Sequence, residues 1–227
     1  VSVGRVPNTE GLGAEEIGLQ SVWISDEFQP WRHHGGHAPY SLSWLAAVGE
    51  RTERVQLGTS VMTPTFRYNP AVVAQAFGTL GSLYPGRIAM GVGTGEALNE
   101  IVVGSVESGE WPDFKERFGR LRESVRLMRA LWTGERVSFE GDYYHTVDAT
   151  IYDKPEGGVP IYVAAGGPVT GLRLLGARVG RVDVSAGLEL LDHVRVDLPA
   201  LGLTVRLVRA ADLDALVPVD PEPAHRL

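Results

Sequence analysis

The chain has 227 residues, of which 44% are hydrophobic, and a formal net charge of −7. This length and composition describe a globular protein with one sizeable core, and the negative charge argues against non-specific binding of nucleic acid. No apolar run reaches the roughly 20 residues of a membrane span, and the lack of cysteine excludes disulfides, thiolate metal sites and cysteine nucleophiles. No apolar core of a signal peptide follows residues 1–5, so we expect a cytoplasmic protein without nucleic-acid or membrane partners.

Residues 14–168 alternate between short apolar runs and segments with helical spacing. The apolar runs predict buried strands of a parallel sheet. Repeated βα units of this kind form either a (β/α)8 barrel or a doubly wound sheet. The predicted strands are residues 22–25, 55–62, 87–92 and 161–165.

Two helices between these strands have clear boundary signals. Asn69 and Pro70 form the pattern of an N-cap followed by proline at the first helical position. Asp113 caps the second helix, and Gly134 stands where it should end. Apolar spacing predicts the buried faces, which are Val73, Ala76, Leu80 and Leu83 in the first helix and Phe114, Phe118, Leu121, Val125, Met128 and Trp132 in the second.

The end of the chain differs in composition from the rest. Every Phe, Tyr and Trp lies before Gly171, whereas roughly six would be expected after it at the earlier frequency. A genuine segment of biased composition and a frameshifted reading both explain this difference. We therefore divide the chain into an unassigned segment 1–13, a region of repeated βα units 14–168, and a divergent tail 169–227.

Carboxylates follow two of the predicted strands. Asp26 and Glu27 come after the first strand, and Glu96 follows the third. In parallel βα architectures the carboxyl ends of the strands meet at one edge, where active sites lie. A carboxylate there can accept a hydroxyl proton if burial or a neighbour raises its pKa. The sequence therefore predicts an enzyme, with further site candidates at the same edge: Trp31, Thr94 and Asn99.

The segment Gly91-Val92-Gly93-Thr94-Gly95-Glu96 approaches a dinucleotide-binding fingerprint. It fails that pattern because Glu96 stands where the third glycine is required. Its glycines either allow close backbone approach to an anionic cofactor or form a tight strand-to-helix turn.

Three histidines, His33, His34 and His37, lie close together in a glycine-rich loop. A metal site would need further ligands on a rigid scaffold, and no cysteine or well-spaced carboxylate completes the set. We therefore expect no metal.

Several segments between Ala14 and Pro168 resemble the F420-dependent glucose-6-phosphate dehydrogenases, which belong to the luciferase-like barrel superfamily. The resemblance implies an α/β fold of the (β/α)8 TIM-barrel type, incomplete in this chain. The matching segments occur in the family's order and are residues 26–31, 35–39, 58–61, 63–70, 93–100 and 164–168.

The resemblance implies an oxidoreductase that transfers a hydride from C1 of glucose 6-phosphate, or a related sugar phosphate, to coenzyme F420. Residues 14–168 would then form a partial (β/α) barrel with the cofactor site. Glu96 matches a catalytic carboxylate, and Trp31 matches an aromatic residue that steadies the reacting centre. A non-proline cis peptide between Ser60 and Val61 would support the deazaflavin ring. Family members often pair as homodimers. The other positions implied to bind the cofactor are Asp26, Thr63, Thr94, Gly95, Asn99, Gly166 and Gly167.

Three departures from the family pattern keep alternatives open. Glu27 stands where the family has a catalytic histidine, and it cannot supply an imidazolium near neutral pH. The first strand and helix are not recognisable before Ala14, and Lys115 and Lys154 are the only lysines, so the family's phosphate-binding residues lack evident counterparts. The alternatives are a luciferase-like flavin oxidoreductase and an inactive truncated remnant that at most binds the cofactor.

Overall fold

A parallel sheet wound in one direction organises the structure. The computed structural model describes residues 18–165, 193–198 and 203–209. Four strands, β1 (Ser21–Ile24), β2 (Gln56–Thr59), β3 (Ile88–Val92) and β6 (Ile161–Ala165), are parallel neighbours in that order. Their order never reverses, as it does at the switch point of a doubly wound sheet, so the barrel type of winding is the one present.

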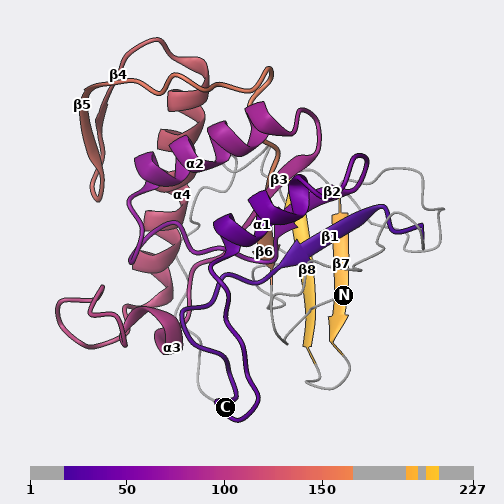
Figure 1. Cartoon of the computed structure of the whole chain (residues 1–227). Coiled ribbons are helices and arrows are strands. Elements are labelled where there is room, and N and C mark those ends of the chain that lie inside the picture. Colours follow the sequence, from indigo (N-terminus) through magenta and orange to yellow (C-terminus); the bar gives the residue numbers. More distant parts are fainter. Residues whose placement is uncertain (1–17, 166–192, 199–202, 210–227) are drawn as a thin grey trace, which may run out of the picture.

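Three helices cover one face of this sheet: α1 (Ser41–Gly49), α2 (Pro70–Leu83) and α4 (Phe114–Thr133) (Figure 1). The side chain of Asn69 accepts a hydrogen bond from the Ala71 N–H, and that of Asp113 accepts one from the Glu116 N–H, so both predicted N-caps are confirmed. Their helices contribute to one apolar core with the outward face of the strands.

The strand register separates this core from an inner face. Val22 pairs with Leu57, and Leu57 pairs with Ile88, all of them buried under the helices. On the opposite face Trp23 lies next to Gly58, and its ring meets that of Tyr162 edge-on at 5.9 Å between centroids. A Cβ on Gly58 would lie 2.4 Å from the Trp23 ring, so the glycine leaves room for the indole.

Several elements differ from the sequence expectations. The predicted strand 55–62 is interrupted, because β2 ends at Thr59 and only Met62 resumes pairing, in a single bridge to Val92. Leu83 and Phe114 are exposed rather than buried. The buried face of α2 runs through Val73, Phe77 and Leu80, which leaves Leu83 in solvent, and Phe114 is the first residue of α4.

Three further features were not predicted. The antiparallel hairpin of β4 (Val137–Glu140) and β5 (His145–Ala149) lies near one end of α4, and the short helix α3 (Ala97–Glu100) lies near the other (Figure 1). In the tail, β8 (Leu203–Arg209) pairs antiparallel with β6, and β7 (His193–Leu198) pairs with β8.

Within the described residues, no helix is both long and apolar enough to cross a membrane.

Candidate active site

The predicted site residues follow the carboxyl ends of three adjacent parallel strands. Asp26 lies two residues beyond β1, Ser60 and Val61 follow β2 directly, and Thr94 lies two residues beyond β3. Because β1, β2 and β3 are parallel and in register, these segments share one edge of the sheet. The expectation of a single edge is confirmed.

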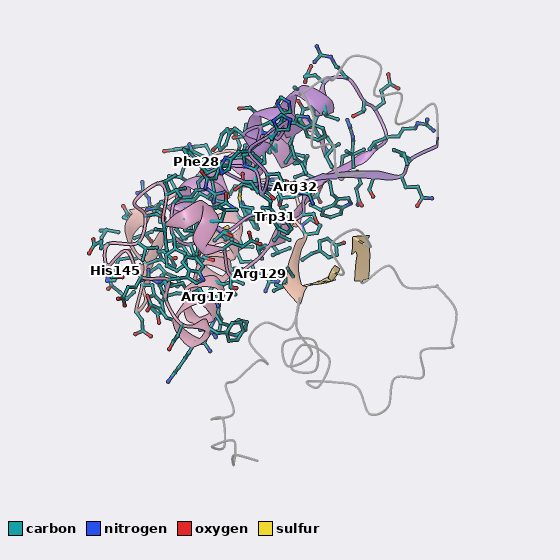
Figure 2. All side chains as sticks on the ribbon, turned by 90° about the horizontal axis from the view of Figure 1, so that it is seen from below. Phe28, Trp31, Arg32, Arg117, Arg129 and His145 are labelled. Atoms are coloured by element: carbon teal, nitrogen blue, oxygen red, sulfur yellow. The ribbon has the colours of Figure 1, made fainter. Side chains whose placement is uncertain are left out.

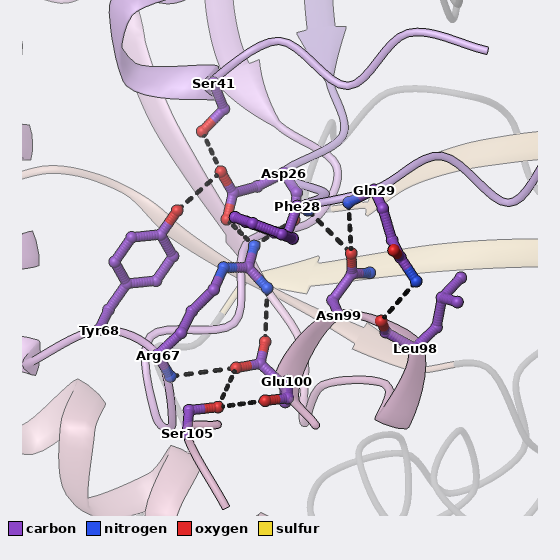
Figure 3. A network of polar contacts seen from close by, with 10 residues as sticks. All are labelled: Asp26, Phe28, Gln29, Ser41, Arg67, Tyr68, Leu98, Asn99, Glu100 and Ser105. Carbon is purple, nitrogen blue, oxygen red and sulfur yellow. Dashed lines mark hydrogen bonds and ion pairs between the residues drawn. The ribbon is translucent and has the colours of Figure 1, made fainter. Parts of the chain in front are cut away.

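Asp26 is held by three side chains (Figure 3). Its Oδ1 accepts hydrogen bonds from Ser41 Oγ at 2.6 Å and Tyr68 Oη at 3.2 Å, and its Oδ2 forms an ion pair with Arg67 Nη2 at 2.6 Å. The side chain of Asp26 is 2% exposed. In this arrangement its carboxylate anchors the loop after β1 to α1 and to the loop after β2.

Arg67 joins Asp26 to a second buried carboxylate, Glu100. The Arg67 Nη1 atom lies 2.5 Å from Glu100 Oε1, and the Arg67 N–H donates to Glu100 Oε2 at 3.0 Å. Burial raises the pKa of Glu100, and the charge of Arg67 acts in the opposite direction. Sequence reasoning assigned no role to Arg67 or Glu100, because no local spacing links residues 33 positions apart.

Asn99 fastens the same loop to α3. Its Oδ1 accepts hydrogen bonds from the backbone N–H groups of Phe28, at 2.8 Å, and Gln29, at 3.3 Å (Figure 3). Gln29 Nε2 also donates to the Leu98 carbonyl at 3.3 Å. The amide oxygen of Asn99 therefore fixes the path of the backbone directly after Glu27.

The peptide between Ser60 and Val61 is cis, as the resemblance implies. Sheet hydrogen bonds enclose it on both sides. The Ser60 N–H donates to the Ile24 carbonyl at 2.7 Å, and the Met62 N–H donates to the Gly91 carbonyl at 2.8 Å. The Thr59 hydroxyl accepts from the Gly91 N–H at 3.1 Å, so a side chain replaces the ladder bond that the interruption removes.

The glycines of β3 and its extension make room for this interruption. A Cβ on Gly91 would lie 2.0 Å from the Thr59 carbonyl oxygen, and one on Gly93 would lie 2.9 Å from Val61 Cγ2. The space beside these two glycines is thus filled by other atoms of the protein. Close internal packing accounts for the Gly-x-Gly pattern that resembled a dinucleotide fingerprint.

Thr63, Gly95 and Trp111 meet at a tight corner beside the cis peptide. Gly95 has a φ of 89°, a left-handed conformation that favours glycine. A Cβ there would lie 2.9 Å from Thr63 Cγ2 and 3.1 Å from Trp111 Cη2. The structure therefore brings the predicted residues Thr63 and Gly95 into direct proximity, and adds Trp111, which sequence reasoning had not singled out.

The Thr94 hydroxyl receives a hydrogen bond from α4. Arg117 Nη1 donates to Thr94 Oγ1 at 3.0 Å. Burial lowers the pKa of Arg117, while the charge of Asp113 acts in the opposite direction. Figure 2 shows Arg117 on the helix α4.

The negative charge of Glu96 acts on the predicted proton-handling residue Glu27. Burial raises the pKa of Glu27, and the negative charges of Glu96 and Asp26 raise it further. Glu96 is exposed at the start of α3. A carboxyl with a raised pKa takes up a proton more readily near neutral pH, which suits general-base chemistry.

Trp31 is 45% exposed, in a loop that also exposes Phe28 and Arg32 (Figure 2). Gly166 and Gly167 lie outside the described residues, so their predicted roles stay predictions. The cofactor roles of the other residues likewise stay predictions.

Comparison with known proteins places the chain in a family. Residues 11–201 match the sequence profile of the luciferase-like monooxygenases. The chain belongs to this family. Its fold is that of the luciferase-like TIM barrel, of which this chain forms a part, as its sequence predicted.

Within the luciferase-like family, the chain is similar to F420-dependent glucose-6-phosphate dehydrogenases, which confirms the resemblance. That of Rhodococcus hoagii (strain 103S) is 59% identical over 222 residues, covering 96% of this chain and 65% of the relative. That of Intrasporangium calvum is 74% identical over 156 residues, covering 69% of this chain and 46% of the relative. The chain thus spans about half to two-thirds of the length of these relatives.

Among solved structures, an F420-dependent secondary alcohol dehydrogenase in complex with an F420-acetone adduct aligns with a TM-score of 0.66 and 40% identity. The alignment covers 72% of this chain and 48% of that one. The monooxygenase RslO1 from Streptomyces bottropensis aligns with a TM-score of 0.59 and 26% identity. Both support the luciferase-like fold.

Proposed function

We propose that this protein is an F420-dependent dehydrogenase that oxidises C1 of glucose 6-phosphate to a lactone. The relatives that match 93–96% of the chain carry this name, and the solved structure at 40% identity is also that of an F420-dependent dehydrogenase. The proposal includes a related sugar phosphate as the substrate.

The edge described above suits a flat, anionic cofactor. The cis peptide at Ser60 interrupts the strand end, and Gly95 turns the chain tightly against Thr63 at the same edge. The Thr94 hydroxyl adds a hydrogen-bonding group. These residues, with Asn99 and the loop of Asp26 behind them, would hold F420, which accepts a hydride when bound.

The two glutamates would manage the proton of the reaction. Oxidation at C1 removes a hydride from the carbon and a proton from its hydroxyl group. Glu27 is desolvated and lies in the field of Glu96, so its carboxylate is a stronger base than a free one. Glu96 is exposed, and it stands at the position where the family resemblance implies a catalytic carboxylate. Trp31, which lies in the loop after β1 like Glu27, would shield the reacting carbon.

One observation carries the proposal: the cis peptide, the Thr63–Gly95 corner and the Glu27–Glu96 pair share one strand edge in a chain whose relatives bear this name. The test mixes the purified protein with F420 and glucose 6-phosphate and follows the visible absorbance of the oxidised cofactor. Loss of absorbance that depends on the sugar phosphate supports the proposal. F420 binding without turnover indicates a cofactor-binding remnant, and uptake of FMN instead of F420 indicates a flavin oxidoreductase.

We also propose a homodimer, which the family resemblance implies, and a cytoplasmic location. Sedimentation of the purified protein and fractionation of the source cells test these two points separately.

A further inference from the structure

Arg117 donates a hydrogen bond to the Thr94 hydroxyl. A guanidinium group can only donate hydrogen bonds, whereas a hydroxyl carries one hydrogen and two lone pairs. Arg117 Nη1 occupies a lone pair of Thr94 Oγ1 at 3.0 Å. The hydroxyl hydrogen is therefore available to donate to a group other than Arg117. Among the described residues, no acceptor of this hydrogen is found.

The guanidinium of Arg117 is itself held in place. Its Nε donates to the Pro112 carbonyl at 3.0 Å, and its Cζ lies 5.3 Å from the Trp111 ring centroid and 5.7 Å from that of Phe114. Arg117 is half-buried. A planar group fixed by a carbonyl and two rings presents its remaining N–H groups in a set direction.

The backbone on the other side of Thr94 is equally constrained. Gly95 adopts a left-handed conformation against Thr63 Cγ2 and Trp111 Cη2. Trp111 thus contacts both the guanidinium of Arg117 and the turn that contains Thr94. The hydroxyl is fixed by its backbone and by its hydrogen-bond donor together.

We infer that Arg117 is a positioning residue that orients Thr94 as a hydrogen-bond donor to an acceptor atom of the bound cofactor. This inference rests on the proposed F420 site. Arg117 acts through Thr94 and does not itself touch the cofactor. Neither the family resemblance nor the names of the relatives assign a role to Arg117.

The test is a double-variant cycle on F420 affinity, measured by quenching of cofactor fluorescence. Arg117→Met should weaken binding by roughly 2- to 10-fold, the value of one hydrogen bond. In a Thr94→Val background the same substitution should have no further effect. Arg120→Met is the matched control, because Arg120 lies one turn along α4, pairs with Glu116 and lies over the rings of Phe66 and Tyr143, with no hydrogen bond to Thr94. The F420 affinity of this variant should equal that of the wild type.

Equal affinity of Arg117→Met and Arg120→Met would overturn the inference, and so would an equal loss in both Thr94 backgrounds. If Arg117→Met does not fold, the cycle is run with Arg117→Leu, which likewise removes the hydrogen-bond donor, and the same two outcomes decide. Failure of the wild type to bind F420 would instead overturn the proposed function itself.

Discussion

Val61 occupies the space that a side chain on Gly93 would need. A Cβ on Gly93 would lie 2.9 Å from Val61 Cγ2, and the backbone of Gly93 does not adopt a left-handed conformation. The requirement for glycine here therefore arises from crowding and not from backbone strain. This contact couples the end of β3 to the segment that follows β2.

Gly93→Ala should reduce the free energy of unfolding by about 1–3 kcal/mol, the usual cost of overpacking. Combining it with Val61→Ala should restore much of that loss, because Val61 Cγ2 is removed. Denaturant unfolding of the two single variants and the double variant measures this coupling. Additive losses in the double variant would contradict a direct contact.

Gly104→Ala provides the comparison for backbone strain. Gly104 has a φ of 70° and no atom within 4 Å of its virtual Cβ. Its substitution should cost about 1–2 kcal/mol through conformation alone, and Val61→Ala should leave that cost unchanged.

Arg67→Met should be among the most damaging single substitutions at the site. It leaves the carboxylates of Asp26 and Glu100, exposed at 2% and 0%, without their counter-charge. Loss of one partner from a buried ion pair costs about 3–5 kcal/mol. Denaturant unfolding measures the effect.

Arg136→Met is the control for Arg67→Met, since it removes an ion pair with Asp148 in which both side chains are more than half exposed. Its cost should stay below about 1 kcal/mol. Similar losses from the two substitutions would argue against a buried charge network centred on Arg67.

Much of this arrangement follows from the sequence, but the charge network does not. The strand ends, the helix caps and the edge shared by Asp26, Thr94 and Glu96 can be predicted, because each depends on a pattern of residues that are close together in the sequence. Arg67 and Glu100 meet only after β2, β3 and α3 have been placed, so no spacing reveals their pairing. The exposure of Leu83 likewise depends on how α2 is rotated against the sheet.

Glu27 should make stability depend on pH. Its pKa is raised in the folded protein, chiefly by burial, so folding favours the protonated form. The stability associated with this group is therefore present at low pH and is lost as the pH rises from the ordinary value of 4.5 through the raised pKa. Glu27→Gln should gain stability relative to the wild type as the pH increases across that range.

Unfolding of both proteins between about pH 4 and about pH 8 measures this difference. Glu110→Gln, in an exposed loop, controls for the change in net charge. A difference between Glu27→Gln and the wild type that stays constant with pH would show that Glu27 is not desolvated.

Glu27→His should increase turnover with glucose 6-phosphate. The family resemblance implies a catalytic histidine at this position, and the nearby carboxylates of Asp26 and Glu96 would favour the imidazolium. A well-placed acid–base group increases the rate of a reaction by a factor of about 100 or more. We therefore expect a gain in turnover of roughly tenfold at neutral pH. Equal rates for Glu27→His and Glu27→Gln would show that this position does not limit the reaction.

A crystal structure of the protein with F420 tests the central claim most directly. We expect the deazaflavin ring against the Ser60–Val61 peptide, with the Thr94 hydroxyl within hydrogen-bond distance of a cofactor acceptor. Glu27 and Glu96 should face the side of the ring where the sugar binds. F420 bound away from the ends of β2 and β3 would contradict the assignment of this edge as the cofactor site.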